Sequence, residues 1–164
     1  MRSSYVAVPG CGLSAGYAPV IEAAIVDLQR ALNQPPENAA AHIGALLPSV
    51  TPCPACKVLQ MAEADYIAQY LAQIASEEAR DAYARMAGLC LPHLQTTLAS
   101  APDNTLAAFL MQEQIRHLEE IAEDMRSFAL KRDAIRRSLI NDEEEHAWRR
   151  ALVQLIGERR ARVV

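Results

Sequence analysis

A row of mostly apolar residues, spaced alternately four and three positions apart, limits the fold of this chain more than any other feature. The row consists of Ala107, Met111, Gln114, Leu118, Ile121, Met125 and Phe128. Leu110, Ile115 and Ala122 lie beside the row and widen the apolar stripe. This spacing is typical of a helix that buries one side against other helices. It predicts a helix of about 27 to 35 residues that begins near Asp103 and forms the centre of a bundle.

The rest of the chain also shows helical patterns and no strand pattern. Helices are expected over residues 19–32, 38–47, 54–74, 76–86, 91–98 and 142–156. Aromatic residues make up only 5% of the chain and alanine is frequent, a composition that favours closely packed helices over sheets. We therefore predict an all-α protein, a multi-helix bundle with one long central helix. Residues 1–17 are expected to form a loose arm, residues 18–157 a single helical domain, and residues 158–164 a charged tail.

Local signals give the ends and the buried sides of several of these helices. Ser76 is expected to cap the helix that follows it, and Asn141 with Glu144 matches a capping box. Gly88 and Gly157 fit helix C-termini. The first helix is indicated by apolar residues at three- and four-residue steps, namely Val20, Ala24, Leu28, Ala31 and Leu32. The buried side of the helix over 54–74 is expected to carry Leu59, Ala62, Tyr66, Tyr70 and Ile74.

Two pairs of metal-ligand residues carry the only specific chemical signal. Cys53 and Cys56 form a CxxC pair, and Cys90 and His93 form a CxxH pair, although the chain has only four cysteines and four histidines. Two such pairs complete the tetrahedron of a structural zinc site. Both pairs stand where helices begin, and the positive end of a helix stabilises thiolates. The sequence therefore predicts a Cys3His zinc site that joins two helix N-termini.

The lengths of the intervening helices restrict how the two pairs can meet. A helix over residues 54–74 rises about 30 Å, whereas a return helix over residues 77–87 descends only about 16 Å. A shared metal site therefore requires a helix break before Ala75, a slanted return, or an extended return segment.

Two other chemistries fit the same cysteines. A CxxC with proline at a helix start is also the layout of thiol–disulfide oxidoreductases, although "CPACKVLQ" offers only Lys57 as a nearby base. An iron–sulfur cluster with one histidine ligand is the other alternative, in a sensor or an electron carrier. Cys11 is a further thiol that could act as a redox partner or an alternative ligand.

Weaker patterns have ordinary structural explanations. Glu143 and His146 have the spacing of a di-iron motif, but that site needs a second such motif, and the residues fit a charged first helical turn. His117 is expected at the edge of the core. The basic stretch that includes Lys131 suits the negative end of the long helix.

The CxxC pair and the CxxH pair resemble those of an uncharacterised family of bacterial all-helical proteins. The likeness rests on "CPxC" at a helix start, "GxCxxH", a long helix, the basic stretch "LKRDAIRR", and a helix with a tryptophan that ends in glycine. It runs from about Thr51 to Gly157 and leaves the first 50 residues outside. The family has no known function, so the resemblance implies the fold and the metal site but no activity.

Charge and hydropathy narrow the function further. The formal net charge of −4 does not indicate a nucleic-acid-binding surface. No apolar run is long enough to cross a membrane, and the start of the chain does not match a secretory signal. We therefore expect a cytoplasmic, non-catalytic protein with a structural zinc site that serves as a protein-interaction or regulatory module. The width of the apolar stripe on the long helix further predicts a homodimer.

Overall fold

A computed structural model describes residues 11–47, 54–131 and 136–158, without the side chains of residues 11, 12, 55 and 56. The described residues form seven α-helices and one short 3-10 helix, with no strand, which confirms the all-α prediction. The helices are α1 (Cys11–Ala31), α2 (Pro36–Leu46), α3 (Pro54–Gln73), α4 (Glu77–Ala84), α5 (Leu91–Ala99), α6 (Asn104–Leu130) and α7 (Asp142–Ile156), with the 3-10 helix η1 (Arg137–Leu139) before α7. Within these ranges no helix is both long enough and apolar enough to span a membrane.

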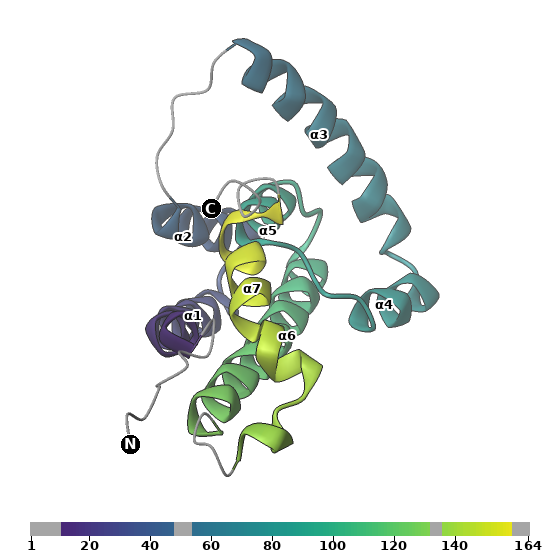
Figure 1. Ribbon diagram of the computed structural model, residues 1–164. Helices are drawn as coiled ribbons and strands as arrows, with labels where there is room; N and C mark the ends of the chain where they lie inside the picture. The colour runs from purple at the N-terminus through teal and green to yellow at the C-terminus, as the bar shows by residue number, and fades with distance from the viewer. Residues whose placement is uncertain (1–10, 48–53, 132–135, 159–164) are drawn as a thin grey trace, which may run out of the picture.

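Helix α6 is the central element, as its apolar row predicts (Figure 1). It has 27 residues, and the Asp103 side chain caps it by accepting a hydrogen bond from the backbone N–H of Leu106 at 2.8 Å. Every residue of the predicted row and of its flanks is buried. Helices α1 and α7 pack along α6. The row is thus covered within one chain, and a second copy is not needed to bury it.

Helix α1 begins earlier than the sequence predicts. Its first residue is Cys11, so residues 11–17, expected in a loose arm, are helical. Ser14 is fully buried, and Ile21 and Leu28 follow it on the same side at seven-residue steps. The expected start was wrong because a serine holds the first buried position and leaves no apolar signal. Pro19 removes one hydrogen bond inside the helix, but it lies on an exposed side where water reaches the free carbonyl.

Helix α3 has the predicted bounds but not the predicted buried side. Leu59 and Tyr66, expected in the core, are 54% and 73% exposed. Ile74 is buried as predicted, and Ile67 and Leu71, which were not expected in the core, are buried with it. Figure 1 shows the cause, since only the C-terminal part of α3 lies against the rest of the molecule while its N-terminal part leads away. The N-terminal part of α3 therefore contributes little to the core.

The chain returns from α3 through a short helix and an extended segment. Ser76 caps α4 as predicted, because its hydroxyl accepts the backbone N–H of Ala79 at 3.2 Å. Helix α4 ends at Ala84, and the residues between it and α5 are not helical. A return of this kind is one of the three that a shared metal site would require. The predicted capping box of Asn141 and Glu144 is also confirmed at the start of α7.

Candidate metal centre

Cys90 and His93, the second predicted ligand pair, lie together at the start of α5. Cys90 is the N-cap residue, and its carbonyl accepts the backbone N–H of Leu94 at 2.8 Å in the first helical turn. Pro92 stands at the beginning of the helix, where its missing N–H costs no hydrogen bond. Because Cys90 and His93 are three positions apart across this turn, the Cys90 Sγ and the His93 Nδ1 are only 3.1 Å apart.

Glu63 holds the opposite side of the His93 ring. The His93 Nε2 lies 2.5 Å from a carboxylate oxygen of Glu63, which belongs to α3. The sequence did not single out this glutamate, although its position seven residues after Cys56 places both on one side of α3. In metal sites, a histidine ligand commonly donates its second ring N–H to a carboxylate, which fixes the tautomer and the ring orientation. Glu63 therefore leaves the Nδ1 of His93 free to face the sulfur.

The electrostatics of this pair favour a charged thiol. Burial alone would raise the pKa of Cys90, but hydrogen bonds from the His93 side chain and from the His93 backbone outweigh it, and the net shift lowers the pKa. The hydrogen bond with Cys90 raises the pKa of His93 to about 9 against the effect of burial, and Glu63 adds to the rise. A thiolate is the form of cysteine that binds a metal, and an incoming metal ion would release the proton of the imidazole.

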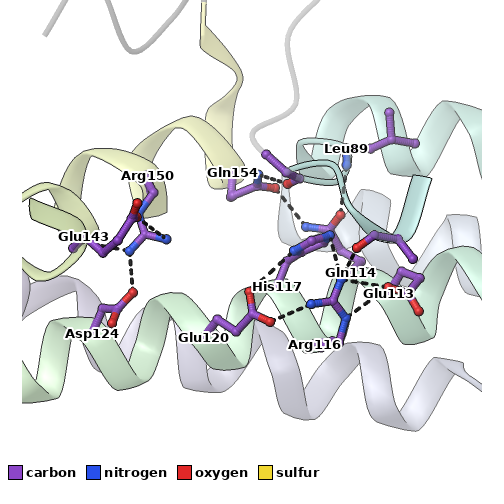
Figure 2. A network of polar contacts seen from close by, with 12 residues as sticks. Leu89, Glu113, Gln114, Arg116, His117, Glu120, Asp124, Glu143, Arg150 and Gln154 are labelled. Carbon is purple, nitrogen blue, oxygen red and sulfur yellow. Dashed lines mark hydrogen bonds and ion pairs between the residues drawn. The ribbon is translucent and has the colours of Figure 1, made fainter. Parts of the chain in front are cut away.

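Two buried glutamines hold the extended segment in front of Cys90 (Figure 2). The side-chain oxygen of Gln114 on α6 accepts the backbone N–H of Leu89 at 3.1 Å. Its nitrogen donates to the side-chain oxygen of Gln154 on α7 at 2.9 Å, and the nitrogen of Gln154 donates to the carbonyl of Ala87 at 2.7 Å. Both side chains are at least nine-tenths buried. The backbone before the ligand pair is thus fixed by residues that lie far along the chain.

Glycines allow the close approach of chain segments around the site. Gly88 has φ +73°, a left-handed conformation that favours glycine. A Cβ atom at Gly88 would stand 2.9 Å from the oxygen of Gln114 and 2.9 Å from the ring of His117. Gly157, at the end of α7, also has a positive φ, and a Cβ there would stand 3.5 Å from the Cys90 Sγ. The end of α7 thus lies against the thiol.

The first predicted ligand pair is only partly covered by the structure. Cys53 lies outside the described residues, and Cys56 is placed by its backbone alone in the first turn of α3. Cys56 and Glu63 are two helical turns apart, about 10 Å along the axis of α3. Within the described ranges no group of three or more His, Cys, Asp or Glu side chains could hold a metal ion. The structure therefore presents two of the four predicted ligands at one place, on the side of α5 that meets α3.

The weaker sequence patterns have local partners. His146 Nδ1 lies 2.8 Å from the carbonyl of Asp142 in the first turn of α7, and Glu143 pairs with Arg150 at 3.3 Å. His117 is 8% exposed, which confirms its position at the edge of the core. Lys131 pairs with a buried glutamate of α7 rather than with the end of its own helix.

A scan against protein-family models and searches of curated proteins and of solved structures found no match to this chain.

Proposed function

We propose that this chain is a non-catalytic helical protein in which one zinc ion, bound by Cys53, Cys56, Cys90 and His93, joins the start of α3 to the start of α5. The observation that supports it best is the 3.1 Å separation of the Cys90 Sγ and the His93 Nδ1, with the Nε2 held by Glu63. Sulfur and nitrogen ligands of a tetrahedral zinc ion are about 3.5 Å apart. A change of a few tenths of an ångström would therefore admit the metal between them.

The surroundings of the pair also suit a zinc ion with three thiolates. Such a site carries a local charge of −1, and the N-termini of α3 and α5 offer positive ends to balance it. Zinc would staple the N-terminal part of α3, which has few other contacts, to the bundle. The exposed apolar side chains of that part of α3 support a role as a protein-interaction or regulatory module.

One observation favours a second candidate function. Cys90, His93 and Glu63 form a line of thiol, imidazole and carboxylate, the arrangement that activates a nucleophilic cysteine. In a thiol–disulfide protein, this line would make Cys90 the attacking thiol and a cysteine of the "CPAC" pair its partner. No contact in the described part of the chain favours the iron–sulfur alternative over these two.

Metal analysis of the freshly purified protein, with an absorbance spectrum, distinguishes the zinc site from the thiol–disulfide protein and the iron–sulfur cluster. The proposal expects one zinc ion per chain and a colourless solution. Cys90→Ser should lose the metal and lower the thermal stability, because the free energy of metal binding adds to that of folding. Cys11→Ser is the matched control, since it removes the one cysteine outside the proposed set and should keep the metal.

Each contrary result points to a defined alternative. A Cys90→Ser variant that keeps its full zinc content would overturn the ligand assignment. A metal-free protein whose Cys90 is alkylated much faster than its other cysteines would indicate thiol chemistry instead. A brown solution with iron and sulfide would indicate a cluster.

A further inference from the structure

Helix α3 exposes more large apolar side chains than any other helix in the described part of the chain. Val58 is 67% exposed, Met61 71% and Tyr66 73%, and Leu59 beside them is more than half exposed. The side of α3 that meets the bundle carries other residues. Glu63 contacts His93 of α5, and Ile67 is buried in the core. Figure 1 shows no other helix beyond α3 on its outer side. These side chains therefore remain in water in the single chain.

The exposed residues form two parallel rows along α3. Residues four apart lie next to each other on a helix surface. One row is Lys57, Met61 and Asp65, and the neighbouring row is Val58, Ala62 and Tyr66. All six residues are exposed. Rows at this spacing are the ridges that pack into the grooves of a second helix.

The charges of the first row are complementary to those of the same row turned end to end. Lys57 and Asp65 stand four positions before and after Met61, and neither has an ion-pair partner among the described side chains. In an antiparallel pair of α3 helices that cross near Met61, Lys57 of each copy comes beside the partner's Asp65. A parallel pair would instead place like charges together, which is unfavourable.

The second row fits the same arrangement. With the crossing point near Ala62, Val58 of each copy comes beside the partner's Tyr66. The small Ala62 at the centre lets the two helix axes approach to the distance of about 8 to 10 Å found in packed helices. Both rows are thus self-complementary about one two-fold axis, the commonest symmetry of soluble oligomers.

We propose that the protein forms a two-fold homodimer through the outer face of α3, paired antiparallel with α3 of a second copy. This face, and not the covered row of α6, is where the chain leaves apolar surface for a partner. A single helix pair buries less than the roughly 1,200 Å² of a standard interface. The dimer should therefore be weak and dissociate in the micromolar range. The pairing uses no metal ligand, so it does not depend on the proposed zinc site.

Sedimentation of the full chain over about 1 to 100 micromolar tests the proposal. The expected mass rises with concentration from 18.0 kDa towards twice that value. Met61→Lys should remain at the mass of one chain throughout this range. Met86→Lys is the matched control, because Met86 is also an exposed methionine, 60% exposed, and belongs to neither row, so the variant should dimerise like the original chain. Circular dichroism would verify that both variants keep their helices.

Charge reversal tests the antiparallel direction without removing apolar surface. Lys57→Glu alone, or Asp65→Lys alone, places like charges at both ends of the crossing and should weaken dimerisation by about tenfold or more. The double variant Lys57→Glu/Asp65→Lys restores opposite charges and should dimerise again. The proposal would be overturned by a constant mass of one chain, by a dimer that persists in Met61→Lys, or by a double variant that dimerises more weakly than either single variant. Zinc content is not the readout of these experiments, so their failure is distinguishable from failure of the proposed zinc site, although the pairing deepens the proposed protein-interaction role.

Discussion

Replacing Gln114 by methionine tests whether the two buried glutamines hold the segment in front of Cys90. Methionine keeps the length and the shape of the side chain but removes both hydrogen bonds, so Leu89 loses the acceptor for its N–H and Gln154 loses the donor to its oxygen. A buried polar group without a partner costs about 1 to 3 kcal/mol. Because Leu89 is only partly buried, we expect a loss of about 2 to 4 kcal/mol for Gln114→Met.

The same bonds give a sharper test through a double-mutant cycle measured by urea denaturation. Gln154→Met also leaves two groups unpaired, namely the Gln114 amide and the carbonyl of Ala87. In the double variant only the Leu89 N–H and the Ala87 carbonyl remain unpaired, so its loss should be close to that of either single variant and far below their sum. Gln112→Met, at an exposed position of α6, is the control and should change stability by less than about 0.5 kcal/mol. A neutral Gln114→Met, or losses that simply add, would refute the reasoning.

Three further perturbations follow from the geometry of the same region. Glu63→Gln should weaken zinc binding about 10- to 100-fold in a chelator competition, and unchanged affinity would remove Glu63 from the site. Gly88→Ala should lower the free energy of unfolding by about 1 to 3 kcal/mol, because Gly88 has a positive φ and because a Cβ atom there would stand 2.9 Å from the side-chain oxygen of Gln114. Gly16→Ala, in open space on α1, should not lower it. Burial, and then the charge of Arg116, lower the pKa of His117 from its ordinary 6.5. The contribution of neutral His117 to the free energy of unfolding is therefore present above pH 6.5 and lost on acidification. The urea midpoint of the original chain should fall more between about pH 7.5 and 5.5 than that of His117→Gln, and parallel curves would contradict the assignment.

Most of the helices could be predicted because their signals are local. The row on α6 repeats over several turns, and the caps at Ser76, Asp103 and Asn141 depend on residues within one turn of each helix start. Such patterns act before any tertiary contact forms. They therefore identify helices and their starts without knowledge of the packing.

The buried side of α3 could not be predicted in this way. Apolar residues occur all round its N-terminal part, so the periodicity selects no single face. Which face is buried depends on where α5 and the rest of the bundle lie. The role of Glu63 could not be predicted for the same reason, because its contact with His93 joins residues 30 positions apart. An exposed glutamate on a helix carries no chemical signal until the structure supplies its partner.

The two glutamines that fix the segment before Cys90 also determine when the site can form. Gln114 and Gln154 follow Cys90 and His93 in the chain, and a growing chain emerges from its N-terminus. The ligand pair is therefore synthesised well before the side chains that hold it in place. Contacts between such distant positions form late, because they require the closure of long loops. Occupancy of the proposed metal site would thus mark a molecule in which α7 has already docked, and a chain stopped before residue 154 would lack the hydrogen bond that Gln154 donates to the segment before Cys90.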